Sequence, residues 1–110
     1  MIEEIIQNYL RENAFPCYMS VPEKPSGNFC VLEKTGSGYE DGIFSATLAV
    51  QSYGSSDYAA AQLSHRVVQT MLDADTLPEI VSCTLNTDYN FPDTTRKLPR
   101  YQAVFEVVHY

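Results

Sequence analysis

The chain has 110 residues, of which 45% are hydrophobic and 19% charged, and its fourteen acids and seven bases give a net charge of -7. This length allows one domain with one hydrophobic core and excludes two separately folded active domains. The apolar content excludes a disordered chain, and seven bases are too few for a groove that neutralises nucleic-acid phosphates.

The cysteines and the N-terminus indicate a compartment. Cys17, Cys30 and Cys83 lie inside apolar runs without Cys-x-x-Cys spacing, which predicts buried free thiols in a reducing environment. Glu3 and Glu4 stand where a signal peptide needs positive charge, and no apolar run approaches the roughly 20 residues that span a bilayer. We therefore expect a protein that is cytoplasmic where it is made.

The first element in chain order is an amphipathic helix of about three turns, because its apolar residues recur at helical spacing with polar residues opposite. Asn13 can close this helix and Pro16 forbids its continuation. A short strand over 15–21 and a loop over 22–28 should follow. The apolar stripe of the helix is Ile2, Ile5, Ile6, Tyr9 and Leu10.

Residues 29–34 and 43–53 predict a β-hairpin, and the glycine-rich stretch 36–42 between them predicts a long, mobile tip. Apolar and polar residues alternate along 43–53, so one face of the sheet should be covered and the other should meet solvent or a partner. The residues expected to point inward are Phe44, Ala46, Leu48 and Val50. The residues expected on the free face are Ser45, Thr47, Ala49 and Gln51.

The apolar period changes from two to 3.6 directly after Gly54, which predicts that a helix follows the strand at once. Ser55, Ser56 and Asp57 are candidate N-caps, and Asp57 also places negative charge at the positive end of the helix dipole. The helix should end near Asp73. Its expected buried stripe is Ala60, Leu63, Val67, Val68, Met71 and Leu72.

Residues 80–89 and 100–110 predict the last two strands, and the loop over 90–99 is long for a small domain. The expected order is helix, three strands, helix, two strands. This predicts an α+β fold in which residues 1–110 form a single domain, with one mixed, mainly antiparallel sheet and two helices on one face. The inward residues should be Val81, Cys83, Leu85, Tyr101, Ala103, Phe105 and Val107.

No pattern in the chain predicts a catalytic, cofactor or metal site. His65 and His109 are the only histidines, and neither stands at ligand spacing from a Cys, Asp or Glu. There is no nucleophile elbow, and Gly36 and Gly38 lack the Gly-Lys-Ser/Thr and following helix of a phosphate-binding loop. We therefore expect no enzyme activity, no cofactor and no metal.

The chain contains eight tyrosines and five phenylalanines, most of which should lie in the core or at its rim. Tyr39 and Phe91 fall in the two predicted loops, where aromatic side chains often anchor an interface. They are candidate contacts with a partner.

Four segments carry a resemblance to a known family: Val-Leu-Glu-Lys-Thr-Gly at 31–36, Ser-Ala-Thr-Leu-Ala-Val-Gln-Ser-Tyr at 45–53, Leu-Asn-Thr-Asp-Tyr-Asn-Phe at 85–91, and Arg-Tyr-Gln-Ala-Val-Phe-Glu-Val-Val-His-Tyr at 100–110. Together with the order of elements, they resemble the small tail-terminator, or tail-completion, proteins of long-tailed bacteriophages and prophages. The resemblance runs from the first helix to the last strand and includes no active-site motif. It implies a structural role in a ring, usually hexameric, that caps the tail tube, ends its polymerisation and helps to join tail to head.

The resemblance also implies partners and a location. The partners would be further copies of the chain, the tail-tube protein and the head–tail connector protein, with DNA passing through the ring without sequence-specific binding and no membrane involved. The protein would be assembled in the bacterial cytoplasm and reside in the virion, at the head–tail junction.

A closed ring requires one patch that meets a different patch on the next subunit. We expect one such patch on the free sheet face, at Ser45, Thr47, Ala49 and Gln51. The two long loops should supply contacts with the tube or connector, through Tyr39, Glu40, Asp41, Phe91, Arg96 and Lys97.

Two other classes of protein stay open. One is a small cytoplasmic ligand-binding or regulatory α+β domain, which a closed apolar pocket would favour. The other is an enzyme built on one of the cysteines or histidines, which a fast-reacting thiol would favour.

Overall fold

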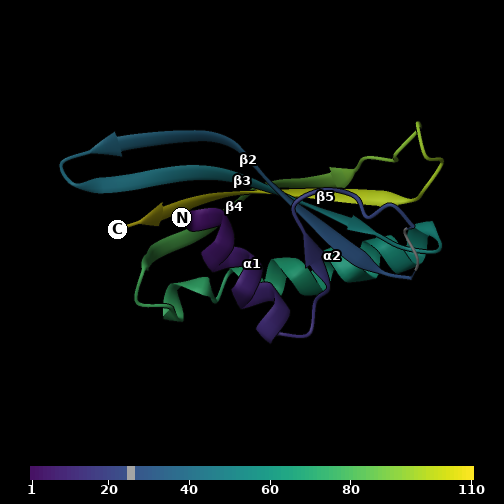
Figure 1. Ribbon diagram of the computed structural model, residues 1–110, viewed down its shortest axis with the longest axis horizontal. Coiled ribbons are helices and arrows are strands. Elements are labelled where there is room, and N and C mark those ends of the chain that lie inside the picture. The colour runs from purple at the N-terminus through teal and green to yellow at the C-terminus, as the bar shows by residue number, and fades with distance from the viewer. Residues whose placement is uncertain (25–26) are drawn as a thin grey trace.

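A computed structural model describes residues 1–24 and 27–110. The described strands form one sheet in the order β1-β2-β3-β5-β4, antiparallel throughout except for the parallel β1–β2 pair, and both helices pack on the same face (Figure 1). The predicted α+β fold and its element order are confirmed. The elements are α1 (Ile2–Glu12), β1 (Cys17–Tyr18), β2 (Phe29–Glu40), β3 (Ile43–Tyr53), α2 (Asp57–Met71), a 3-10 turn (Ala74–Thr76), β4 (Ile80–Asn90) and β5 (Arg100–His109).

The helices share one face of the sheet because each has an apolar stripe to bury. The Tyr9 hydroxyl of α1 donates a 2.7 Å hydrogen bond to the carbonyl of Thr70 in α2, which joins the two helices. Ser56 is the N-cap of α2, and its Oγ accepts from the backbone N–H of Ala59 at 3.1 Å. The helix ends at Met71, so the expectation that the following Leu72 belongs to the buried stripe is wrong.

The β2–β3 hairpin is longer than predicted. Strand pairing runs without a loop up to Glu40 and Ile43, so the expected mobile tip over 36–42 is wrong. Asp41 and Gly42 make a two-residue turn with φ values of 52° and 83°, as a type I′ turn requires. Gly36 and Gly38, which predicted a loop, lie inside β2 opposite β3.

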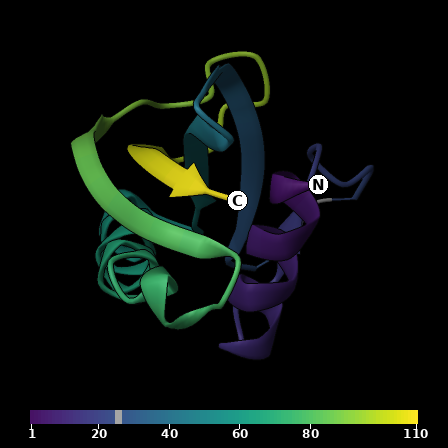
Figure 2. The same cartoon turned by 90° about the vertical axis from the view of Figure 1, so that its left-hand side faces the viewer.

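The paired end of this hairpin projects beyond the helices, and we call residues 36–47 the arm (Figure 1). The whole molecule measures 43 × 24 × 23 Å, with the arm at one end of the long axis and the loop over 91–99 at the other. Seen along the long axis, the sheet is strongly twisted above the two helices, and both termini lie on the side of the arm (Figure 2).

The second face of the sheet is not free along its whole length. At the end away from the arm, Phe29, Val31 and Tyr53 are buried on it, with Val21 and Leu98 packed against them. The segments before β2 and between β4 and β5 supply this cover. Two long connections therefore cover a small second core. The alternation of apolar and polar residues along one strand does not predict such cover.

Two smaller expectations also fail. The first strand spans only Cys17–Tyr18 rather than 15–21, because the chain pairs with β2 only opposite Cys30 and Val31. Val81 does not point into the core and is 42% exposed, because a bulge between Ile80 and Ser82 shifts the register of β4.

The junction of β3 and α2 requires a glycine at position 54, because the backbone at the start of α2 occupies the space of a side chain. A Cβ on Gly54 would lie 2.5 Å from the backbone nitrogen of Ala60 and 2.8 Å from the carbonyl carbon of Ala59. The immediate change from strand to helix therefore leaves no room for another atom.

We predict that Gly54→Ala lowers the free energy of unfolding by about 1–3 kcal/mol, because the added methyl group must displace backbone. Chemical denaturation measures this loss. Gly36→Ala is the matched control, since its Cβ would meet Thr47 Oγ1 at an ordinary 3.6 Å. Equal stability of Gly54→Ala and Gly36→Ala would contradict the prediction.

Candidate functional site

A row of stacked side chains crosses the sheet at the end opposite the arm. Phe29 and Tyr53 stack with ring centroids 4.7 Å apart, and the Arg100 guanidinium lies 5.6 Å from the Tyr53 ring and 4.3 Å from the Phe91 ring. Every strand contributes one member, and the loop contributes Phe91. In order across the sheet the row is Tyr18, Phe29, Tyr53, Arg100, Phe91 and Tyr89.

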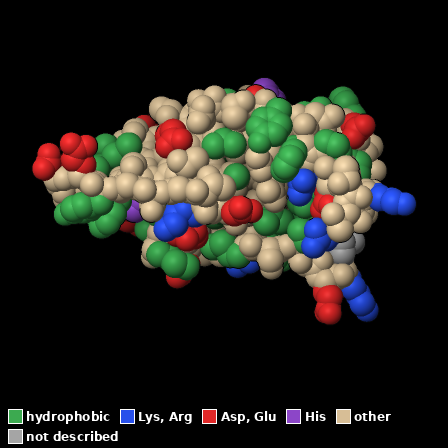
Figure 3. Space-filling model, turned by 90° about the horizontal axis from the view of Figure 1, so that it is seen from above, with side chains coloured by type: hydrophobic (Ala, Val, Ile, Leu, Met, Phe, Trp, Pro, Cys, Tyr) green, Lys and Arg blue, Asp and Glu red, His purple; other side chains and the backbone are tan. Residues whose placement is uncertain are grey.

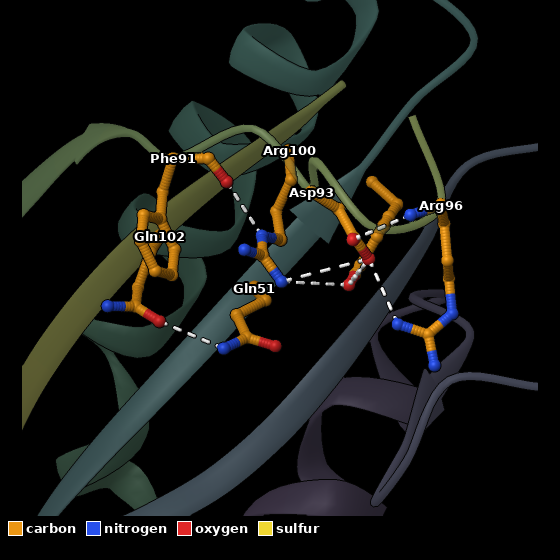
Figure 4. A network of polar contacts seen from close by, with 7 residues as sticks. Gln51, Phe91, Asp93, Arg96, Arg100 and Gln102 are labelled. Atoms are coloured by element: carbon orange, nitrogen blue, oxygen red, sulfur yellow. Dashed lines mark hydrogen bonds and ion pairs between the residues drawn. The ribbon is translucent and has the colours of Figure 1, made fainter. Parts of the chain in front are cut away.

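A buried carboxylate holds the loop over 91–99, which we call the β4–β5 loop, against this row (Figure 4). Asp93 is 4% exposed, and its Oδ2 accepts hydrogen bonds from the Tyr53 hydroxyl at 2.9 Å and from Arg96 Nη1 at 3.1 Å. Arg100 Nη1 lies 3.9 Å from the same oxygen and donates to the Tyr53 hydroxyl at 3.1 Å. Arg100 Nε donates to the Phe91 carbonyl at 2.6 Å, so one guanidinium ties both ends of the loop.

The charge of Asp93 is favoured despite its burial. Burial acts to raise the pKa of the carboxyl, but hydrogen bonds from the Arg96 backbone, the Tyr53 hydroxyl and the Arg96 side chain act against it. With the nearby Arg100 charge, they hold this pKa below its ordinary value. Burial is also the main cause that raises the pKa of the Tyr53 hydroxyl. At neutral pH the site therefore contains an ionised carboxylate and a protonated phenol.

The same contacts fix the shape of the β4–β5 loop. Asp93 and Leu98 exchange two backbone hydrogen bonds of 3.0 and 3.1 Å, which closes a tight turn. Lys97 has a left-handed φ of 56° within that turn and is exposed, as is Arg96. The turn presents basic side chains on a rigid support, and Figure 3 shows several basic side chains at this end of the molecule.

The arm forms a different surface at the other end. Tyr39 and Phe44 contact each other with ring centroids 4.7 Å apart, and Phe44 stacks on His109 of β5 at 5.5 Å. These rings lie beyond the reach of the helices, so Tyr39 is 65% and Phe44 is 44% exposed. Glu40 and the turn residue Asp41 make the tip acidic (Figure 3).

A cavity of about 590 Å³, which we call the arm cavity, lies between the arm and the start of α1. Ile5 and Ala46 line its apolar part, and Phe44 and His109 contribute aromatic wall. Glu3 lines it as well, with Oε2 3.7 Å from Lys34 Nζ. Glu3 Oε1 is buried and accepts no hydrogen bond from any described residue.

The four residues expected on the free face differ in what they offer. Ser45 is exposed, whereas Ala49 is 2% exposed, so the expectation that its side chain is free is wrong. Thr47 and Gln51 are half-buried and hydrogen-bonded across to β5. Thr47 Oγ1 donates to the Glu106 carboxylate at 3.1 Å. Gln51 Nε2 donates to Gln102 Oε1 at 2.9 Å, as Figure 4 shows. Ser45 alone is both exposed and on the arm.

The candidate contacts from the two predicted loops divide between the ends of the molecule. Tyr39, Glu40 and Asp41 lie on the arm, and the arm is a hairpin rather than a loop. Phe91, Arg96 and Lys97 lie in the β4–β5 loop. Phe44 was expected to point inward with Ala46, but its side chain is 44% exposed, because no helix covers it. Sequence reasoning missed the other side chains that support these contacts, which are His109, Asp93 and Arg100. The i, i+3 spacing of Asp93 and Arg96 was the only local signal for any of them.

All three cysteines are free and buried. Burial raises the pKa of Cys17 to about 11, of Cys30 to about 12 and of Cys83 to about 11. Within residues 1–24 and 27–110, no cluster of three or more His, Cys, Asp or Glu side chains could hold a metal ion. No helix in this part of the chain is both long and apolar enough to cross a membrane.

No protein-family model matches the chain, and no curated protein matches its sequence.

We predict that Asp93→Asn lowers the free energy of unfolding at pH 7 by about 3 kcal/mol, because Arg100 then keeps a largely buried charge without its partner. The folded-state pKa of Asp93 is depressed, so its contribution is present above the unfolded value of about 3.9 and is lost as pH falls through the folded value. The difference between the proteins in chemical denaturation should therefore shrink in acid. Asp88→Asn, at an exposed position of β4, is the control. A pH-independent difference would contradict this assignment.

We predict that Cys17, Cys30 and Cys83 react slowly with iodoacetamide at pH 7 in the folded protein, because the reactive thiolate is scarce and shielded. All three should react fully once urea unfolds the chain. Mass spectrometry counts the added groups. Rapid modification of one thiol in the folded protein would instead favour an enzyme or a redox role.

Proposed function

We propose that the protein is a structural component of the head–tail junction of a long-tailed bacteriophage or prophage. It would cap the tail tube as a ring, end tail polymerisation and help to join tail to head. The observation that supports this proposal is the presence of two unlike exposed surfaces at opposite ends of a small domain. The sequence resemblance to tail-terminator proteins is the reason for proposing a ring on the tail tube rather than another kind of assembly.

Unlike surfaces are what a ring needs from each subunit. A two-fold dimer can use one self-complementary patch, but a ring joins one patch to a different one. The arm offers exposed aromatic rings and an acidic tip, and the β4–β5 loop offers Arg96 and Lys97 on a fixed turn. Each surface could contact a further copy, the tail-tube protein or the connector.

The acid excess also fits the proposed ring. DNA that passes through a ring must not adhere to its wall, and a net charge of -7 per chain repels phosphates. No sequence-specific contact with DNA is part of this proposal.

We predict that native mass spectrometry of the chain with the tail-tube protein from the same locus detects a ring several times the 12.4 kDa mass of one chain. A shortened arm should abolish tail joining while the domain still folds. Deleting Tyr39, Glu40, Ile43 and Phe44 leaves Gly38 paired with Ser45 across the same two-residue turn, which preserves the alternation of the hydrogen-bond ladder.

Circular dichroism and the unfolding midpoint of the shortened chain provide the folding control. Normal tail joining by a folded, shortened chain would contradict a contact role for the arm. A chain that forms no complex with the tube protein would overturn the proposed function.

The arm cavity favours a second candidate, a small ligand-binding or regulatory domain. Its volume of about 590 Å³ is within the range that small molecules occupy. Such a domain would stay monomeric with the tube protein, so the same measurement of mass separates the two functions.

A further inference from the structure

The arm cavity combines an aromatic wall with the Glu3 carboxylate, two features that attract a cation, and the Lys34 ammonium also lines it. Tyr39, Phe44 and His109 form a continuous row of rings along one wall, and Tyr39 and Phe44 are exposed. The faces of aromatic rings attract ammonium and guanidinium groups, more strongly where water is partly excluded. A purely apolar ligand would leave this property unused.

Glu3 gives the cavity a carboxylate with spare capacity. Its Oε2 is near Lys34 Nζ at 3.7 Å, which is long for a hydrogen bond, and its buried Oε1 has no donor among the described residues. The negative charge of this carboxylate at the cavity wall favours a cation over an apolar or anionic group. Glu40 and Asp41 extend the negative charge to the adjacent tip.

The opposite end of the same molecule carries a matching group. Lys97 is exposed, makes no ion pair with any described residue, and is held in a turn closed by the two Asp93–Leu98 hydrogen bonds. Because the turn is already fixed, binding costs little backbone entropy, although the Lys97 side chain still loses rotamer freedom. The neighbouring Arg96, in contrast, is engaged by Asp93.

We propose that the arm cavity of one copy binds the β4–β5 loop of the next copy, with the Lys97 ammonium placed between the aromatic row and the Glu3 carboxylate. The two surfaces lie at opposite ends of the 43 Å axis, so the contact is head-to-tail and propagates until the assembly closes. This inference rests on the proposed ring and names the surfaces that join its subunits.

A complementation experiment tests the head-to-tail contact. Lys97→Glu removes the loop surface and keeps the arm cavity, whereas Glu3→Gln keeps the loop and weakens the cavity. Sedimentation velocity should show that wild type assembles and that each variant alone associates about tenfold more weakly or worse. In an equimolar mixture, the intact loop of Glu3→Gln should bind the intact cavity of Lys97→Glu. The resulting two-chain complex should not grow, because its remaining cavity and its remaining loop are both altered.

Controls separate this contact from general effects. Lys24→Glu makes the same charge change at an exposed position and should assemble like wild type, and Lys97→Arg should retain assembly. Each variant must keep the unfolding midpoint of the wild type. The arm-shortened chain offers a second way to remove the cavity and should behave like Glu3→Gln in the mixture.

Three outcomes would overturn the inference. They are normal assembly of Lys97→Glu, no pairing in the mixture, and a wild-type chain that stays monomeric up to its solubility limit. None of them decides the proposed function, because a ring could form through other surfaces or only on the tube protein. Conversely, if the chain forms head-to-tail complexes but does not bind the tube protein, the inference is supported and the proposed function is contradicted.

Discussion

The buried carboxylate of Asp93 is the interaction on which the end of the molecule away from the arm depends. It collects donors from β3 and from its own loop, and it orients Arg100 between two aromatic rings. Since a buried charge is tolerated only when it is paired and hydrogen-bonded, the loop must close over it in one conformation. A connection of nine residues, which would otherwise be free to sample many shapes, becomes part of a second small core.

The arm follows from the opposite situation. The inward face of β3 continues past the helices. Phe44 lies on the same face as the buried Ala46, Leu48 and Val50, but beyond the part that the helices cover. The arm extends beyond the first residues of α1, so this helix does not cover the aromatic ring of Phe44. Cross-strand contacts with Tyr39 and His109 stabilise the exposed segment, and they also leave its aromatic surface available. The same alternation that builds the core therefore also produces the surface beyond it.

Sequence predicts this fold well where periodicity is local. The helical stripes, the change at Gly54 and the order of elements depend on residues a few positions apart, and the structure confirms them apart from Leu72. Gly36 and Gly38 misled the prediction, because glycine is typical of loops while strand pairing was decided by β3 opposite them. The Asp93 site could not be predicted either, since it brings together Tyr53 and Arg100 from strands that are distant in the chain. Arg96 and Lys97 were placed correctly in a loop, but their rigid presentation comes from contacts that sequence does not display.

The shortness of β1 affects how the unassembled chain behaves. Among the described residues, the outer side of β2 pairs with β1 at Cys30 and Val31, and from Leu32 to Glu40 that side has no strand partner. A long, open edge of this kind is a template on which other chains can add as strands, and charged side chains along it counteract such growth. Glu33, Lys34 and Glu40 are the charges on this edge. The colloidal behaviour of the free subunit, and the salt in which it can be stored, should therefore depend on three side chains that play no part in its core.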